Sequence, residues 1–225
     1  MNGPLGQLIQ GISQGRIDII VSALIVAALL LLICFPIHEF AHAYVATKLG
    51  DDTPRLMGRV TLNPLAHLDP FGSILFLLFG FGWAKPVPVN TNRLNGNRST
   101  SFALVAIAGP MSNVLLAICF AALFRIFEPL LGSSSAFLSS VILSGLEIAV
   151  FLNLILALFN LIPIPPLDGS RVLALLLPPQ ATAVMQTLER YGFMILMLVS
   201  IAAPSLFSAL ITTPASDVAR ALLGF

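Results

Sequence analysis

The sequence predicts an all-α polytopic membrane protein with about four transmembrane helices, and three observations support this fold class. Hydrophobic residues make up 57% of the 225 residues and charged residues only 9%, far below the roughly 25% charged residues of a soluble domain. No charged residue occurs between positions 19 and 37. Both cysteines lie inside apolar stretches, so the sequence predicts no disulfide framework.

The first predicted membrane helix runs from about residue 17 to residue 49. Its length of roughly 48 Å exceeds the ~30 Å hydrocarbon core of a bilayer, so it tilts or extends into water or a cavity. Pro36 removes a backbone hydrogen bond and is expected to kink this helix. Residues 1–14 lack the pattern of a cleavable signal peptide, so we expect the first helix to remain in the membrane.

The next region is expected to enter the membrane without crossing it. Residues 50–70 are polar and rich in turn formers, whereas 71–83 is apolar, short and interrupted by glycines. This pattern favours a re-entrant loop or a short β-hairpin over a spanning helix. In residues 85–89, Pro86 and Pro88 alternate with Lys85, Val87 and Val89. This pattern is typical of an edge strand.

Three further apolar segments complete the predicted topology. They cover about residues 101–127, 137–162 and 191–211, and the last forms an additional C-terminal transmembrane helix. No stretch is long enough for a separate soluble domain. We therefore expect residues 1–225 to form a single membrane-embedded domain.

The distribution of basic residues predicts the orientation. With four spans, eight of the eleven lysines and arginines fall on the side of the two long loops, and three fall on the other. The eight are Lys48, Arg55, Arg59, Lys85, Arg93, Arg98, Arg171 and Arg190. This bias places the long loops in the cytoplasm. A fifth span at 71–84 would weaken the bias, which again favours the re-entrant interpretation.

The motif His38-Glu39-Phe40-Ala41-His42 follows directly after the uncharged stretch at 19–37. A helix places residues i and i+4 on one face, so His38 and His42 can bind one metal ion while Glu39 reaches a bound water. Ionisable groups at membrane depth are costly and indicate function. The motif predicts hydrolysis of a peptide bond within the bilayer, at a site about 15 Å from the Lys48 end of the helix.

A catalytic zinc site needs a third protein ligand. Asp168 is the candidate, because it follows a proline-broken segment at the end of a membrane helix. The alternative role for Asp168 is capping a helix. His67 is a rival ligand, although a polar contact within its loop is the simpler interpretation. Cys34 lies one turn before His38 and is expected to fill space in the core.

Three motifs together resemble the site-2 protease family of intramembrane zinc metalloproteases. They are His38–His42, Gly109-Pro110-Met111-Ser112-Asn113, and Asn160-Leu161-Ile162-Pro163 with Leu167-Asp168-Gly169. The resemblance covers about residues 17–175. It implies that His38, His42 and Asp168 bind one Zn²⁺, that Glu39 activates water, and that the first three segments form a three-helix core. Many members carry a PDZ or CBS domain, and this sequence shows neither.

The expected substrate is a membrane protein with a single-span or signal-peptide-like segment. Such a helix must unwind before cleavage, and the 71–89 region is the candidate for receiving it as an added strand. Asn113 and Asn160 are candidates for binding the substrate backbone or the oxyanion, although both could instead form hydrogen bonds between helices. Asn153 is similar, but Asn160 is favoured because it belongs to the third motif.

Other functions remain as alternatives. A zinc transporter would need ligands spread over several helices, whereas all three histidines precede residue 68. A non-catalytic scaffold would be expected to lack Glu39 or a ligand, and a lipid hydrolase could use the same chemistry. We expect a prokaryotic plasma-membrane protein whose active site opens toward the cytoplasm, with a lipid bilayer and a membrane substrate as partners and no nucleic acid. The sequence does not define the oligomeric state.

Overall fold

The computed structural model describes residues 3–133, 136–177 and 182–225, which form helices and connecting loops. The α-helices are α1 (Pro4–Gln14), α2 (Ile17–Ala28), α3 (Phe35–Lys48), α4 (Thr53–Leu56), α5 (Pro70–Phe79), α6 (Arg98–Leu131), α7 (Phe137–Asn160), α8 (Gly169–Leu176), α9 (Thr182–Ala202), α10 (Pro204–Phe207) and α11 (Thr213–Leu223). The all-α fold class predicted from the sequence is confirmed.

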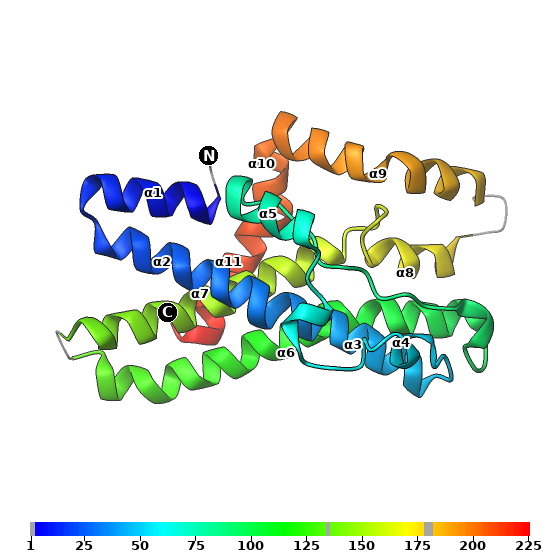
Figure 1. Cartoon of the computed structure of the whole chain (residues 1–225), viewed down its shortest axis with the longest axis horizontal. Coiled ribbons are helices and arrows are strands. Elements are labelled where there is room, and N and C mark those ends of the chain that lie inside the picture. The colour runs from blue at the N-terminus through cyan, green and yellow to red at the C-terminus, as the bar shows by residue number, and fades with distance from the viewer. Residues whose placement is uncertain (1–2, 134–135, 178–181) are drawn as a thin grey trace.

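Three continuous helices in the described part of the chain are long and apolar enough to cross a membrane. They are Ile17–Lys48, Arg98–Leu131 and Phe137–Asn160, with 32, 34 and 24 residues. They run along the long axis of the molecule (Figure 1). Their bounds agree with the first three predicted segments to within a few residues.

The first long helix changes its winding just before the His38–His42 motif. A π-helical stretch, Leu29–Cys34, joins α2 to α3, and Pro36 lies in the first turn of α3. Proline lacks the N–H that would continue the α-helical ladder, and a π-helical turn is a common accommodation at functional sites. This turn sets the face on which the two histidines of α3 emerge.

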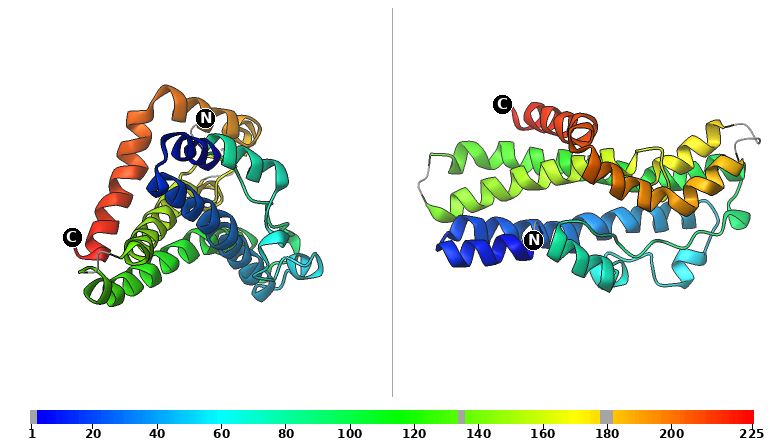
Figure 2. Two further views of the ribbon diagram at one scale, coloured as in Figure 1. Left: turned by 60° about the vertical axis from the view of Figure 1, so that its left-hand side comes forward. Right: turned by 90° about the horizontal axis from the view of Figure 1, so that it is seen from above.

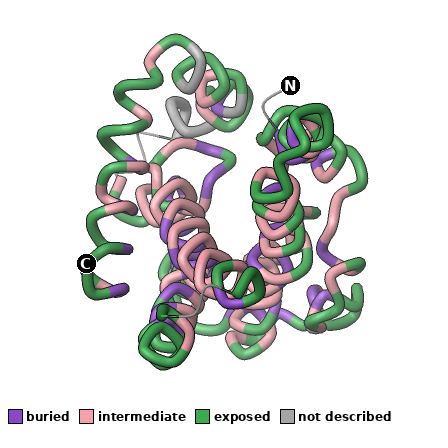
Figure 3. Tube along the Cα trace, turned by 90° about the vertical axis from the view of Figure 1, so that its left-hand side faces the viewer, coloured by how far each residue is buried: buried purple, intermediate pink, exposed green. Residues whose placement is uncertain are grey.

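Small residues let the long helices approach closely. Ala117 and Ala121 of α6 pack against Val150 of α7, and Ala215 and Ala219 of α11 complete the same buried cluster. Small side chains are the usual means of close helix packing in a membrane, where van der Waals contact replaces the hydrophobic driving force. Along the long helices, buried positions are interspersed with intermediate and exposed ones (Figure 3).

The chain between residues 68 and 84 forms a loop whose two ends meet. Helix α5 begins after Asp69, whose side chain accepts a hydrogen bond from the Gly72 N–H, and Leu68 forms an isolated antiparallel bridge with Ala84. The two ends therefore lie side by side, as the re-entrant interpretation requires. The predicted β-hairpin and the edge strand at 85–89 are wrong. Pro86 and Pro88 supply no backbone donors, so the extended chain makes no ladder.

The predicted C-terminal transmembrane helix at 191–211 is also not continuous. Helix α9 ends at Ala202, and Pro204 begins the short α10 in a new direction (Figure 2). A proline disfavours helical backbone in the preceding residue and cannot donate to the turn before it. The chain then continues through a π-helical stretch, Ser208–Thr212, into α11.

Helix α1 is an element that sequence reasoning missed. Pro4 occupies its first turn, and Gly15 ends it in a left-handed conformation with φ of 64°. The helix turns back along α2 and also contacts α5 (Figure 1). It thus connects the start of the first long helix to the re-entrant region.

Candidate metal centre and active site

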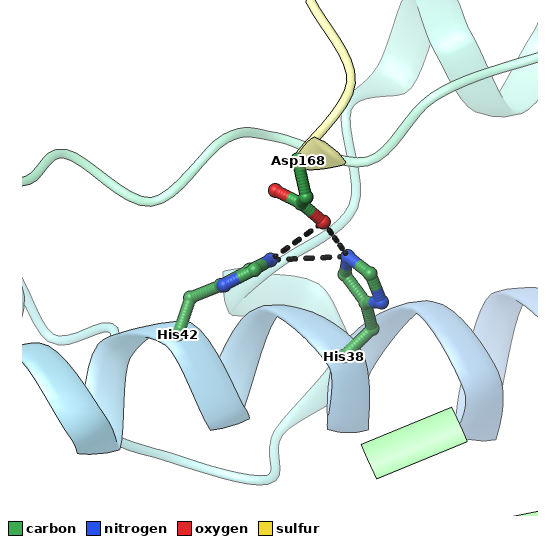
Figure 4. Close-up of side chains that lie close together, drawn as sticks. All are labelled: His38, His42 and Asp168. Atoms are coloured by element: carbon green, nitrogen blue, oxygen red, sulfur yellow. Dashed lines mark hydrogen bonds and ion pairs between the residues drawn. The ribbon is translucent and has the colours of Figure 1, made fainter. Parts of the chain in front are cut away.

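Three side chains from two distant parts of the sequence converge on one point (Figure 4). His38 and His42 extend from the same face of α3, and Asp168 enters from the loop that precedes α8. The Nε2 atoms of the two histidines are 3.1 Å apart. Oδ2 of Asp168 lies 3.2 Å from Nε2 of His38 and 3.3 Å from Nε2 of His42.

This triangle has the dimensions of three ligands on a tetrahedral zinc ion. Zinc bonds of about 2.0–2.2 Å at tetrahedral angles separate neighbouring ligand atoms by about 3.3–3.6 Å, and the three separations found here lie at or slightly below this range. Oδ2 of Asp168 is buried and has no hydrogen-bond partner, which is costly for a carboxylate oxygen without a cation. Asp168 makes no side-chain cap to α8, so the capping alternative is not realised.

The hydrogen bond made by Nδ1 of His42 leaves its Nε2 atom unprotonated, with a free lone pair. Nδ1 of His42 lies 2.7 Å from the carbonyl oxygen of Val105 in α6. A carbonyl can only accept, so Nδ1 carries the proton. In the neutral imidazole, the lone pair on Nε2 then points toward His38 and Asp168.

A chain of amides orients His38 in the same way. Asn153 donates through Nδ2 to the Ala149 carbonyl at 2.8 Å, and its Oδ1 accepts from Nδ2 of Asn113 at 2.9 Å. Oδ1 of Asn113 therefore faces Nδ1 of His38, at 2.6 Å. The carbonyl at the end of this chain fixes the direction of every bond in it, so Nδ1 of His38 is the donor.

Three electron-rich atoms thus face one another with no proton among them. Two imidazole lone pairs and one carboxylate oxygen at these separations repel each other unless a cation lies between them. Hydrogen bonds that hold the outer nitrogen of a ligand histidine are the usual support of a metal site. The donor set and its orientation fit zinc.

Glu39 lies next to this group but is not part of it. Its Oε2 accepts a hydrogen bond from the Val87 N–H at 3.1 Å, which links α3 to the extended chain after α5. Glu39, His38, His42 and Asp168 all line one cavity of about 1080 Å³. The cavity wall is otherwise mostly apolar. It includes Phe76, Trp83, Val87, Phe102, Leu156 and Phe207.

Comparisons with known proteins agree with this geometry. The family model described as Peptidase family M50 matches residues 26–199, a region that contains the whole site. The chain belongs to peptidase family M50. The resemblance to the site-2 protease family seen in the three motifs is thereby confirmed.

Several curated relatives are similar over most of this M50 chain. YwhC of Bacillus subtilis is 47% identical over 74% of this chain and 76% of its own length. Rip2 of Mycobacterium tuberculosis strain H37Rv is 31% identical over 83% of this chain and 69% of its own, and MJ0611 of Methanocaldococcus jannaschii is 32% identical over 70% and 82%. The names of all three contain the words zinc metalloprotease. No solved structure gave a significant match.

The second M50 motif supplies space as well as an amide. A Cβ atom on Gly109 of α6 would lie 2.3 Å from Nε2 of His42 and 2.6 Å from Cε1 of His38. No side chain fits between α6 and the histidines at this position. Gly109 therefore lets α6 pack against the histidine face of α3, and Asn113, one turn later, reaches His38.

The two asparagines predicted to bind substrate have different positions. Asn113 is fully buried, and both ends of its amide are occupied by His38 and Asn153, so it faces the histidine and not the cavity. Asn160 lines the cavity, and its Nδ2 donates to the Leu156 carbonyl of its own helix. Asn153, ranked below Asn160 from the sequence, is the residue that completes the amide chain.

The rival ligands lie outside the metal group. His67 is fully buried, and its Nε2 lies 2.7 Å from the Thr61 carbonyl. Cys34 is buried in an apolar cluster with Leu30 and Phe76. Among the residues that the structure describes, the only group of three metal-binding side chains is His38, His42 and Asp168. The contacts of Val105 and Val87 with the site were not predicted, because backbone groups carry no sequence signal.

Proposed function

We propose that this chain is an intramembrane zinc protease that cleaves peptide bonds within or near the membrane-spanning segments of other proteins. The single observation that carries the proposal is the position of the metal group. His38 and His42 lie on a 32-residue apolar helix, ten and six residues before its end, and they open into a cavity lined mainly by apolar side chains. A buried site of this kind suits an apolar peptide segment.

His38, His42 and Asp168 hold the zinc ion in this proposal, one per chain. When bound, zinc supplies a Lewis acid that acidifies a water molecule and polarises the scissile carbonyl. Asn113 and the Val105 carbonyl keep both imidazoles in the tautomer that leaves Nε2 free. The membrane helices and the apolar cavity wall limit the access of other water.

Glu39 is the general base. Its carboxylate takes a proton from the attacking water and later delivers it to the nitrogen of the leaving amine. The new C–O bond forms before the C–N bond breaks. The immediate products are a carboxylic acid and an amine, and transfer of the remaining water proton from the acid to the amine gives a carboxylate and an ammonium group. The hydrogen bond from the Val87 N–H holds the Glu39 side chain toward the cavity.

The extended chain that follows α5 receives the unwound substrate. Ala84, Pro86, Val87 and Val89 line the cavity beside Glu39. An extended backbone with accessible polar groups can align a second extended chain by main-chain hydrogen bonds. Asn160 lines the same cavity, and in this proposal it contacts the substrate backbone.

The remaining features of the proposal concern location. Residues 1–225 form one membrane-embedded domain in a prokaryotic plasma membrane, with the long loops and the opening of the site toward the cytoplasm. Substrates are single-span or signal-peptide-like segments, and fragments are released toward the cytoplasm. The transport alternative is less well supported, because the described residues offer one metal group and not a series of them.

Cleavage in proteoliposomes tests the proposal. Wild type and Glu39→Gln are mixed with a single-span membrane peptide and with a water-soluble, unstructured peptide, and the products are identified by mass spectrometry. We expect wild type to cut the membrane peptide in its apolar segment, a chelator to stop the reaction, and added zinc to restore it. Equal activity of Glu39→Gln, or cleavage of the soluble peptide alone, would overturn the proposal.

A further inference from the structure

Two buried charged residues outside the metal site hold the extended segment 85–90. Arg59 is 4% exposed and Asp51 is fully buried, and both belong to the polar loop between α3 and α5. Neither residue lines the active-site cavity or contacts the metal group. Segment 85–90 runs from α5 toward α6 alongside α3 (Figure 1), and it carries the Val87 N–H that binds Glu39.

Arg59 binds the beginning of this segment. Its Nη1 donates to the Pro86 carbonyl at 2.9 Å, and its Nη2 donates to the Lys85 carbonyl. The guanidinium takes part in none of the ion pairs found in the described part of the chain. A buried cation is costly, and here the two terminal nitrogens of the guanidinium donate to consecutive backbone carbonyls.

Asp51 binds the end of the same segment. Its Oδ2 accepts a hydrogen bond from the Asn90 N–H at 2.6 Å. Its Oδ1 accepts from the backbone N–H and the hydroxyl of Thr53 at the start of α4. One carboxylate oxygen therefore stabilises the turn and the other holds the segment.

The two anchors lie on either side of the contact with Glu39. Arg59 fixes the carbonyls of residues 85 and 86, Asp51 fixes the amide of residue 90, and the Val87 N–H between them meets Oε2 of Glu39. Pro86 and Pro88 also remove two donors that could pair elsewhere. Both buried charges thus act on the main chain of one short segment.

We propose that Arg59 and Asp51 are positioning residues that hold segment 85–90 where Val87 orients Glu39 and where the segment can align a substrate strand. The inference rests on the proposed protease function for its effect on catalysis. Its structural part concerns only the segment and stands apart from that function. A misplacement of about 1 Å in such a support costs about 100-fold in rate.

The chain offers a matched control pair in the same loop. Arg55 and Asp52 are exposed and form a surface ion pair at 3.6 Å, so they carry the same charges without holding segment 85–90. The test compares Arg59→Gln and Asp51→Asn with Arg55→Gln and Asp52→Asn. Zinc content and thermal unfolding are measured on each purified protein to establish that it is folded.

Hydrogen exchange followed by mass spectrometry supplies a readout that does not depend on activity. In the 84–90 peptide, Pro86 and Pro88 carry no amide, so exchange reports mainly on Lys85, Val87, Val89 and Asn90. We expect Arg59→Gln and Asp51→Asn to keep one zinc per chain and to exchange this peptide about tenfold faster than wild type. The control pair should exchange at the wild-type rate.

Kinetics on the membrane peptide complete the test. In both anchor variants kcat/KM should fall about 100-fold, with a lower kcat and a higher KM, because the segment serves both Glu39 and the substrate. Arg59→Lys, which keeps the charge but lacks the planar fork that reaches both carbonyls, should recover part of the loss. The control variants should retain wild-type kinetics.

Two results would overturn the inference. One is wild-type exchange and kinetics in Arg59→Gln and Asp51→Asn. The other is loss of zinc from Arg59→Lys as well as from Arg59→Gln, which would mean that Arg59 supports the whole fold. If wild type cleaves no membrane peptide, the proposed function fails, and the exchange and zinc measurements still decide the positioning role.

Discussion

Oδ1 of Asn113 lies 2.6 Å from Nδ1 of His38, at the end of a chain of amides that starts at the Ala149 carbonyl. Asn113→Ala removes the acceptor that fixes the imidazole tautomer, so we expect the affinity for zinc to fall by about 10- to 100-fold. Competition with a zinc chelator measures the change. Asn160→Ala is the control, because that amide bonds only to its own helix; unaltered affinity in Asn113→Ala would refute the tautomer argument.

A methyl group on Gly109 should abolish the metal site. Its Cβ would lie 2.3 Å from Nε2 of His42, and that imidazole cannot move away without losing its bond to Val105. We expect Gly109→Ala to fold with its helices intact, by circular dichroism, and to lose zinc. Gly145→Ala is the matched control, because its nearest neighbour would be at an ordinary 3.7 Å. Full zinc content in Gly109→Ala would contradict the packing argument.

His67 should make the fold less stable in mild acid. Burial lowers the pKa of its imidazole, and the charge of Arg59 acts in the same direction. The unfolded chain has a pKa of about 6.5 at this residue. Below that pH, His67 is protonated in the unfolded chain but stays neutral in the folded protein. The free energy of unfolding therefore decreases as the pH falls from about 6.5 toward the lower pKa of His67 in the folded protein.

The variant His67→Gln isolates this effect. We expect wild type to lose more thermal stability than the variant between about pH 7.5 and about pH 5.5, and zinc content to be the same in both. Calorimetry and metal analysis provide the two measurements. An identical pH dependence in the two proteins would show that His67 contributes nothing, and zinc loss would restore it as a candidate ligand.

Arg125 should anchor the C-terminal helix. Its Nε donates to the Leu222 carbonyl at 2.6 Å and its Nη2 to the Ala221 carbonyl at 3.1 Å, which satisfies carbonyls at the end of α11. Hydrogen bonds from a charged group contribute about 1.5–3 kcal/mol when buried and less when exposed. We expect Arg125→Ala to expose α11 to limited proteolysis. Arg16→Ala, which breaks only a surface pair with Asp18, should be cut at the wild-type rate.

The long helices and the pairing of His38 with His42 could be predicted because their signals are local. Uncharged stretches define membrane helices, and the spacing of His38 and His42 follows from helix geometry. Asp168 is a candidate from its place after a proline-broken helix end, and the resemblance of the three motifs supports it. Nothing local shows that a residue 126 positions after His42 lies against it. The contacts that orient the histidines depend on how α3, α6 and α7 pack.

The sequence predictions that were wrong, at 85–89 and 191–211, failed because prolines interrupt regular backbone hydrogen bonding. The alternation at 85–89 looked like a strand, yet Pro86 and Pro88 carry no N–H, and the segment forms no ladder with another described part of this chain. The apolar stretch at 191–211 looked like one helix, and Pro204 divides it. The roles of Arg59 and Asp51 could not be found from the sequence, because their partners are main-chain atoms of another segment.

Metal analysis of four purified proteins tests the central claim most directly. Wild type and Glu39→Gln should each contain one zinc ion per chain, because Glu39 lies beside the ligand triangle and not in it. His38→Ala and Asp168→Ala should lose zinc sharply, since each removes one of three ligands. More than one zinc per wild-type chain, or zinc that persists in Asp168→Ala, would contradict the account.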